Sequence, residues 1–363
     1  MGKPIYLDYQ ATTPVDPRVL VAMLPYFGVK FGNAASRTHP YGWEAEKAVD
    51  LARKRVAALA GATAREVVFT SGATESNNLA IKGVGEGHVV TVATEHKAVL
   101  DPVKRRGNAT VLPVRPDGSI DLDQLREAIT PETVLVSLMH ANNEIGVIHP
   151  VAEIAAICRE RGVLFHCDAA QSFGKIALAG AFDLMSVSAH KIYGPKGVGA
   201  LYVRRGVRLE AQMDGGGHES GMRSGTLNVP GIVGFGEACA ICEREMAEES
   251  ARIGALRDRL LAGMPDGARV NGSMEHRLAG NLNVSFDGVD AKSLLLELPQ
   301  LAVSTGSACT SAQADPSHVL KAIGSQPGIR FGPGRFTSED EVDRAAEMVR
   351  AAVTKLRHLS PVH

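Results

Sequence analysis

Residues 183–203 constrain the fold of this chain more than any other stretch. A short apolar segment, Asp183–Val187, leads into the polar turn Ser188-Ala189-His190-Lys191, and a Gly/Pro segment then leads into a second apolar segment, Gly199–Val203. The two apolar segments predict buried strands, with a lysine in the turn between them. Burial lowers the pKa of a lysine and frees its amine as a nucleophile. Such an amine beside phosphate-binding groups is what the cofactor pyridoxal phosphate (PLP) requires, although a surface-loop lysine is an equally simple interpretation of this stretch alone.

Short apolar runs alternate with amphipathic segments through much of the chain. We expect strands at Glu66–Thr70, Val89–Ala93, Val134–Met139 and Val163–Cys167, and helices at Tyr41–Ala60 and Val151–Arg161. The strands are continuous apolar runs, which is typical of a sheet covered on both faces, and their alternation with helices favours parallel pairing. The sequence therefore predicts an α/β fold, and its polar candidate residues follow strand C-termini, where open α/β sheets bind ligands.

The character of the sequence changes after about Gly236. We expect a long charged helix at Glu237–Leu261, then strands at Val284–Phe286 and Leu301–Val303, and a final amphipathic helix at Ser338–Leu356. These elements predict a smaller α+β lobe, and a length of 363 residues suits two lobes. We expect a large domain of residues 16–236 and a small domain that combines residues 1–15 with residues 237–363.

Composition narrows the possible surroundings and partners. The 39 basic and 40 acidic residues nearly cancel, so nothing indicates binding to nucleic acid or to an anionic membrane surface. No apolar run approaches the roughly 18 residues that span a bilayer, and the N-terminus lacks the apolar core of a secretion signal. The five cysteines are an odd number without disulfide-like spacing, which predicts a reducing, cytoplasmic setting.

Two strand ends carry groups suited to PLP. Ser71-Gly72-Ala73-Thr74 joins a strand to a helix, and the backbone N–H groups at such a helix start bind phosphate. Asp168 ends another strand, with Gln171 three residues on. A carboxylate at that place keeps a pyridine nitrogen protonated, so that the ring acts as an electron sink. An ordinary helix N-cap is the competing interpretation of both motifs.

Three further motifs are ambiguous when each is taken alone. His96 also follows a strand, and a histidine there can stack on a flat ring or move protons near neutral pH. The amides of Asn142-Asn143 could bond a phenolic oxygen, or they could shape a turn. The glycine-dense stretch Gly215–Thr226 could approach a phosphate, or it could be a surface loop.

The last two candidates lie in the expected small lobe. Cys309 sits in the small, polar stretch 304–316, and a cysteine in an exposed loop is more often kept for reactivity than for packing. Arg330 and Arg335 lie close together, and arginine is the usual fork for a substrate carboxylate, although two solvated surface arginines would look the same. Cys239 and Cys242 have C-x-x-C spacing but no second ligand pair, so zinc is not expected.

Together these residues make the chain closely resemble the cysteine desulfurases, which are fold-type-I PLP enzymes, and within them the iron–sulfur-cluster-assembly branch. The resemblance covers nearly the whole chain. Its most specific motifs are residues 70–76 (Thr-Ser-Gly-Ala-Thr-Glu-Ser), residues 142–146 (Asn-Asn-Glu-Ile-Gly), residues 190–197 (His-Lys-Ile-Tyr-Gly-Pro-Lys-Gly) and residues 306–309 (Gly-Ser-Ala-Cys). It implies a large lobe with a mostly parallel seven-stranded sheet, a small α+β lobe, PLP as the cofactor and a homodimer.

The resemblance also implies a role for each matching residue. It makes Lys191 the Schiff-base lysine, Cys309 the nucleophile that accepts sulfur, and Arg330 the clamp for the carboxylate of L-cysteine. The cofactor's pyridine nitrogen would pair with Asp168, its phenolic oxygen with Gln171 and Asn143, and its ring would stack on His96. The phosphate would be held by Ala73, Thr74, Ser188 and His190, and by Thr226 from the other subunit. Asn143 would also lie beside the substrate.

The implied activity converts L-cysteine to L-alanine and leaves a persulfide on Cys309. His96 would act as acid or base at one of the two thiols. The persulfide would pass to an iron–sulfur scaffold or another acceptor protein, and Cys309 could transiently ligate an iron–sulfur cluster there. Two alternatives remain from the sequence: another fold-type-I enzyme, such as an aminotransferase or a selenocysteine lyase, and a non-enzymatic paralogue.

Two departures from the family pattern affect these expectations. The family usually has Arg-Phe-Ser-Leu-Gly-Arg where this chain has Arg330-Phe-Gly-Pro-Gly-Arg335, and proline fixes φ and removes a donor, which bears on substrate fit. The sequence ends at His363, where close relatives continue with a tail that contacts the scaffold. Scaffold binding is therefore less firmly implied than desulfuration.

Overall fold

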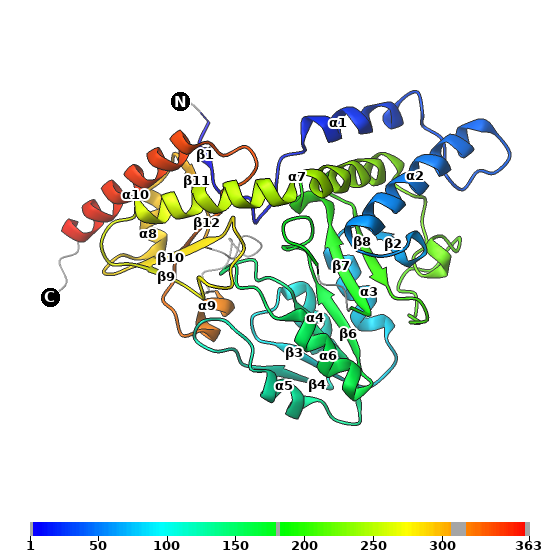
Figure 1. The fold of residues 1–363 in the computed structure, drawn as a ribbon, viewed down its shortest axis with the longest axis horizontal. Coiled ribbons are helices and arrows are strands. Elements are labelled where there is room, and N and C mark those ends of the chain that lie inside the picture. The colour runs from blue at the N-terminus through cyan, green and yellow to red at the C-terminus, as the bar shows by residue number, and fades with distance from the viewer. Residues whose placement is uncertain (1–2, 179–181, 306–316, 360–363) are drawn as a thin grey trace.

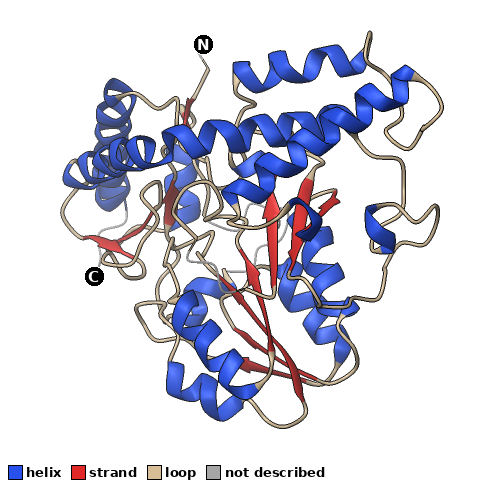
Figure 2. Ribbon diagram, turned by 45° about the vertical axis from the view of Figure 1, so that its right-hand side comes forward, coloured by secondary structure: helices blue, strands red, loops and turns tan. Residues whose placement is uncertain are grey.

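The computed structural model describes residues 3–178, 182–305 and 317–359. Figure 1 shows a large lobe built around a sheet and a smaller lobe beside it, with the long helix α7 (Val229–Ala262) running across both. The same two-lobed arrangement is visible when the molecule is turned (Figure 2). The predicted α/β architecture with an additional small lobe is therefore confirmed.

The large lobe contains the predicted mostly parallel, seven-stranded sheet. Its strands, in spatial order, are β2 (Val67–Thr70), β8 (Gly199–Val203), β7 (Leu184–Ser188), β6 (Leu164–Asp168), β5 (Thr133–Met139), β3 (His88–Val92) and β4 (Ala109–Leu112). β8 runs antiparallel to both of its neighbours, and every other neighbouring pair is parallel. The antiparallel β8 follows from the short connection after β7, because a parallel return needs a long crossover.

Helices cover both faces of this sheet, as the continuous apolar strands predicted. On one face, α3 (Ala73–Gly83) and α4 (Lys97–Arg106) pack against side chains such as Val68 and Leu135. The opposite face packs against the remaining helices of the large lobe and the first part of α7: α1 (Pro17–Met23), α2 (Pro40–Leu59), α5 (Leu122–Ala128) and α6 (Val151–Arg161). Two apolar cores therefore flank the sheet, one on each face.

The small lobe has its own sheet and its own apolar core. Its antiparallel sheet has the order β12 (Ile329–Phe331), β10 (Leu282–Phe286), β9 (Ala268–Val270). A separate parallel pair joins the N-terminal strand β1 (Ile5–Tyr6) to β11 (Leu301–Ala302). The helices are α8 (Ala291–Glu297), α9 (His318–Ala322) and α10 (Glu339–Leu359). The N-terminal segment thus packs with the C-terminal lobe, through Ile5 and Leu7 in its core.

Helix α7 is longer than the sequence pattern predicts, because it begins at Val229 rather than at Glu237. Its first part contributes Phe235 and Ile241 to the core of the large lobe, and its later part contributes Leu256 and Leu260 to the core of the small lobe. The expected domain boundary after Gly236 falls inside this continuous helix, and the division into domains stays a prediction. Within the described residues, we find no helix whose length and apolar character would let it cross a membrane.

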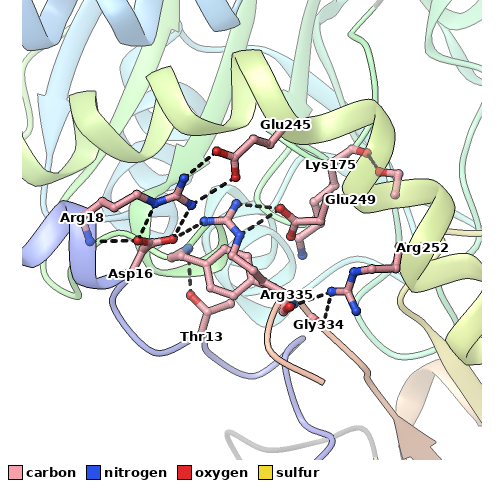
Figure 3. A network of polar contacts seen from close by, with 11 residues as sticks. Thr13, Asp16, Arg18, Lys175, Glu245, Glu249, Arg252, Gly334 and Arg335 are labelled. Atoms are coloured by element: carbon pink, nitrogen blue, oxygen red, sulfur yellow. Dashed lines mark hydrogen bonds and ion pairs between the residues drawn. The ribbon is translucent and has the colours of Figure 1, made fainter. Parts of the chain in front are cut away.

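Charged side chains join the N-terminal segment, α7 and the loop after β12 (Figure 3). Arg335 pairs with Asp16 at 2.8 Å and with Glu249 at 2.7 Å, and Arg18 pairs with Asp16 and Glu245. The Arg335 guanidinium also lies over the ring of Tyr193, 4.1 Å from the ring centre. The network therefore fixes the two lobes relative to each other close to Lys191.

Candidate active site

A cavity of about 470 Å³ lies at the rim formed by the C-terminal ends of β5, β6 and β7. Every predicted site residue that the structure describes, apart from Thr226, lines this cavity: Ala73, Thr74, His96, Asn143, Asp168, Gln171, Ser188, His190, Lys191 and Arg330. Residues far apart in sequence therefore meet where an open α/β sheet binds its ligands. Cys309 lies outside the described residues, so its position in the site stays a prediction.

Lys191 sits in the polar turn between β7 and β8, as expected. The turn is a short 3-10 helix, Ala189–Lys191, that directly follows the end of β7. The Lys191 Nζ donates hydrogen bonds to two backbone carbonyls of the N-terminal segment, 2.5 Å from Gln10 O and 2.8 Å from Ala11 O. The amine is thus held at a defined place on the cavity wall, and the surface-loop interpretation is wrong.

Asp168 is both a backbone cap and a cavity residue. Its Oδ1 accepts a hydrogen bond from the backbone N–H of Ala170 at 2.9 Å, and its Oδ2 accepts one from Asn77 Nδ2 at 2.7 Å. The side chain is buried, and Gln171 does not reach back to it but donates instead to Gln10 O at 2.9 Å. A buried carboxylate oriented in this way suits a cationic ring nitrogen.

His96 likewise caps a helix and faces the cavity. Its Nδ1 accepts a hydrogen bond from the backbone N–H of Ala98 at 3.0 Å, at the start of α4. Burial lowers the pKa of His96, and the carboxylate of Asp168 opposes this shift. The neutral ring is therefore favoured, and because Nδ1 accepts, its proton belongs on Nε2. His96 thus offers the cavity a donor at Nε2.

The expected phosphate cradle is assembled from two strand ends. Gly72 is the N-cap of α3 and has φ = +148°, a conformation that favours glycine, and Ala73 and Thr74 form the first turn. His190 lies opposite, with Nδ1 3.1 Å from Thr12 Oγ1, and burial followed by the charge of Lys191 lowers its pKa to about 4. A neutral His190 can donate or accept beside a phosphate, and the start of α3 supplies N–H donors.

Thr226 is the predicted cradle residue that does not reach this cavity within one chain. It is exposed, and it lies at the end of the glycine-dense segment. That segment is held against α3 by an ion pair of 2.8 Å between Arg223 and Glu75. The assignment of Thr226 to a site in a second subunit stays a prediction.

The adjacent Asn142 and Asn143 have different roles. The Asn142 side chain shapes the turn, because its Oδ1 accepts from the backbone N–H groups of Glu144 and Ile145. Asn143 lines the cavity, and its carbonyl accepts a hydrogen bond of 2.7 Å from Arg330 Nη1. The turn-shaping interpretation is thus confirmed for Asn142, and the role of Asn143 at the phenolic oxygen stays a prediction.

The structure contradicts the alternative that Arg330 and Arg335 are solvated surface residues. Their side chains are 2% and 9% exposed, respectively, and both form ion pairs. Arg330 lines the cavity, whereas Arg335 belongs to the interlobe network. The departure from the family pattern between them also has a local reason, because a Cβ on Gly332 would overlap the side chain of Gln10.

Sequence reasoning missed the N-terminal segment as a part of the site. Gln10, Ala11 and Thr12 line the cavity, and they contact Lys191, Gln171 and His190. Most of these contacts are made by backbone carbonyls, which every residue type has, so the sequence does not reveal them. His318 was also missed, although it lines the cavity and its Nε2 donates to the carbonyl of Glu95 at 2.9 Å.

The donors and acceptors around the cavity fit PLP. A lysine amine, a buried carboxylate, a helix N-terminus with neighbouring hydroxyls and a flat imidazole match the aldehyde, the pyridine nitrogen, the phosphate and the ring of that cofactor. Within the described part of the chain, no group of three or more His, Cys, Asp or Glu side chains could hold a metal ion. The expectation that Cys309 transiently ligates a cluster falls outside that part and stays a prediction.

The fold and the cavity together define a PLP-dependent enzyme of fold type I. The family model described as "Aminotransferase class-V" matches residues 5–345. The chain is 56% identical over 386 residues to "Cysteine desulfurase IscS" of Anaeromyxobacter dehalogenans (strain 2CP-C), covering 100% of this chain and 96% of the relative. The relative of the same name from Dechloromonas aromatica (strain RCB) is 54% identical, and the match covers 100% of this chain and 95% of that relative. The chain therefore belongs to the class-V aminotransferase family.

Solved structures support the same assignment. A "NIFS-LIKE PROTEIN" superposes with a TM-score of 0.90 at 36% identity, covering 97% of this chain and 100% of its own. A structure titled "SspA in complex with cysteine" superposes with a TM-score of 0.79 at 35% identity, covering 92% of this chain and 99% of its own. The fold-type-I expectation from the sequence is thus confirmed.

Proposed function

We propose that this protein is a PLP-dependent cysteine desulfurase, which removes sulfur from L-cysteine to give L-alanine and an enzyme persulfide on Cys309. One observation carries the proposal: a single cavity brings together Lys191, Asp168, His96 and Arg330. These groups can hold the cofactor, keep its ring charged, exchange a proton and bind an α-carboxylate, respectively. The full-length relatives named cysteine desulfurase IscS support the same reaction.

The residues that would hold PLP come from the large lobe. Lys191 would bind it covalently, Asp168 would pair with its ring nitrogen, and Gln171 and Asn143 would bond its phenolic oxygen. When bound, PLP supplies an electron sink for the bonds at the substrate's α-carbon. Its phosphate would be held by Ala73, Thr74, Ser188 and His190.

The substrate would be oriented from the side of the small lobe. The Arg330 guanidinium would bind the α-carboxylate of L-cysteine, because a buried arginine fork suits a carboxylate. The amine of Lys191 would then take up the proton from the α-carbon. His96 lines the cavity and its Nδ1 is occupied by the N–H of Ala98, so Nε2 is the ring atom through which it would exchange a proton with a thiol.

Cys309 would accept the sulfur atom of the substrate. A new S–S bond forms between the Cys309 sulfur and the substrate sulfur, the substrate C–S bond breaks, and the β-carbon takes up a proton. L-cysteine and one enzyme thiol thus become L-alanine and one enzyme persulfide. The persulfide would pass to an iron–sulfur scaffold or another sulfur-acceptor protein in the cytoplasm.

A homodimer would complete the site. Thr226 is exposed in the single chain and outside the cavity that it would serve. Large apolar side chains are also exposed around α1 and the loop after it, including Val21, Phe27, Val29 and Phe31 at 65–78%. An exposed apolar group of this kind is typical of an interface, and a second copy of the chain would cover it.

The proposal is tested by incubating the PLP-loaded protein with L-cysteine while recording alanine, sulfide and keto-acid formation. With a thiol reductant present to release the persulfide sulfur as sulfide, we expect alanine and sulfide in equal amounts. Without reductant, an alkylating label applied after one turnover should modify the peptide that contains Cys309. Lys191→Ala should fold but lose the visible absorbance of the bound cofactor. Keto-acid formation, or a label on a peptide without Cys309, would contradict the proposed reaction.

A further inference from the structure

The N-terminal segment supplies the charged partner of Arg330. Asp8 Oδ1 lies 2.7 Å from Arg330 Nη2, and the side chains are 17% and 2% exposed, respectively. This guanidinium also donates from Nη1 to the carbonyl of Asn143 at 2.7 Å. A buried guanidinium needs a compensating charge, and Asp8 provides one at hydrogen-bonding distance.

The backbone around Asp8 is fixed relative to the strand that carries Arg330. Asp8 forms a parallel bridge with Gly332, just after β12. The N–H of Gly332 donates to Leu7 O at 2.6 Å, and the N–H of Tyr9 donates to Gly332 O at 3.1 Å. Hydrogen bonds on both sides of Asp8 therefore set the distance between its carboxylate and the root of the arginine side chain.

A second carboxyl group, that of Glu144, lies near the same guanidinium. Glu144 lines the cavity and lies near enough to Arg330 for that charge to lower its pKa. Burial outweighs this effect and raises the pKa of Glu144 overall, so it is the weaker ionic partner. Asp8, at 2.7 Å, is therefore the stronger ionic partner of Arg330.

We propose that Asp8 is a positioning residue, which holds the Arg330 guanidinium in the orientation that accepts an α-carboxylate and so sets the preference for amines that carry one. This inference rests on the proposed role of Arg330 as the carboxylate clamp. Asp8 itself need not touch the substrate. Its negative charge also repels a carboxylate, so the proposal requires that orientation of the guanidinium outweighs this repulsion.

Binding of two small amines tests the proposal without turnover. L-alanine and ethylamine differ by the carboxylate, and the visible absorbance of the PLP-loaded enzyme reports the dissociation constant of each. Asp8→Ala should raise the dissociation constant of L-alanine about tenfold, on the scale of one charge-assisted hydrogen bond, and leave that of ethylamine within about twofold. Tyr6→Phe is the matched control, because it removes the hydroxyl that donates to Asp8 O and Thr12 O but keeps the carboxylate.

The outcomes separate this proposal from the one on which it rests. An unchanged or tighter affinity of Asp8→Ala for L-alanine would overturn the positioning role, as would an equal loss for both amines. Should Asp8→Ala fail to fold, Asp8→Asn takes its place, with the same selective loss expected at about threefold. Arg330→Gln should remove the preference for L-alanine entirely. A preference that survives in Arg330→Gln would refute the clamp itself rather than the role of Asp8.

Discussion

Arg330 and Arg335 lie in the same short segment, are both buried and are both paired with carboxylates, yet they belong to different regions of the molecule. Arg330 lines the cavity, and its guanidinium pairs with Asp8 through Nη2 and donates to a backbone carbonyl through Nη1. Arg335 pairs with Asp16 and Glu249 (Figure 3). Its guanidinium also lies over the ring of Tyr193.

The two regions show that burial and charge pairing do not identify a functional arginine. Arg335 satisfies two carboxylates and stacks on an aromatic ring, so its surroundings are complete without a ligand. Arg330 stands at the edge of a cavity large enough for a cofactor and an amino acid. The position relative to the cavity, and not the ion pair, therefore indicates which arginine binds substrate.

The largest effect is expected from Arg330→Gln. It should lower kcat/KM for L-cysteine about a thousandfold, or about 4 kcal/mol of transition-state stabilisation. The reason is that the α-carboxylate of the substrate loses its charged hydrogen bonds to a buried guanidinium. The cofactor absorbance should remain, because the PLP-binding groups come from the large lobe. Steady-state sulfide release checks the rate. A loss below tenfold would place substrate binding elsewhere.

Arg335→Gln should have the opposite profile. It leaves Asp16 and Glu249 without their shared partner, which should cost about 3 kcal/mol of unfolding free energy. The KM for L-cysteine should change less than threefold. Denaturant unfolding and initial-rate measurements on the same preparation check both. A large rise in KM with unchanged stability would mean that Arg335, too, serves the site.

Sequence patterns identified most of this architecture and most of the site. The helix at Val151–Arg161 and the strand at Gly199–Val203 agree with the structure residue for residue. These two predictions agree with the structure because apolar periodicity is a local property that burial enforces. The motif residues that follow the strands line one cavity, as predicted, because parallel strands bring their C-terminal ends to one rim.

Sequence patterns did not predict the features that depend on contacts between distant segments. The start of α7 was placed too late, because its first turns, from Val229, are apolar and glycine-rich and give no charged helical pattern. The N-terminal segment was missed because it acts through the carbonyls of Gln10 and Ala11, and every residue type has a carbonyl. Whether an arginine is exposed depends on packing, which is why Arg335 could not be separated from Arg330.

His149, unlike the two arginines, is a buried titratable group without an ion pair among the described residues. Neither ring nitrogen of His149 has a hydrogen-bond partner among the described residues. Burial lowers the pKa of His149 to about 4. The charge of His140 adds a smaller lowering effect, and Asp117 opposes it slightly. Because its folded-state pKa lies below the usual 6.5, the unfolded chain binds this proton first, and stability falls as the pH drops from about 6.5 toward 4.

His149→Leu should therefore lose less stability in acid than the parent protein. Between pH 7 and pH 5 the difference should be about 2 kcal/mol of unfolding free energy, from about 1.5 pKa units at 1.36 kcal/mol each. Urea unfolding at several pH values gives this slope. Arg335→Gln serves as the control, because its ion pairs should change stability about equally across this range. Parallel pH profiles for the parent and His149→Leu would contradict the assignment.

The smallest effect is expected at Gly332, between the two arginines. A side chain there would overlap Gln10, whose Nε2 donates to the carbonyl of Gly280 and which lines the cavity beside Lys191. Gly332→Ser should cost about 1 kcal/mol of unfolding free energy, because a small added group in a packed place displaces its neighbour. Shortening the neighbour in Gln10→Ala should make room, so the double variant should recover most of that loss. A double-mutant cycle by thermal unfolding measures the coupling. Additive effects would show that the serine disturbs the backbone instead, and the departure at this position would then have a cause other than the size of Gln10.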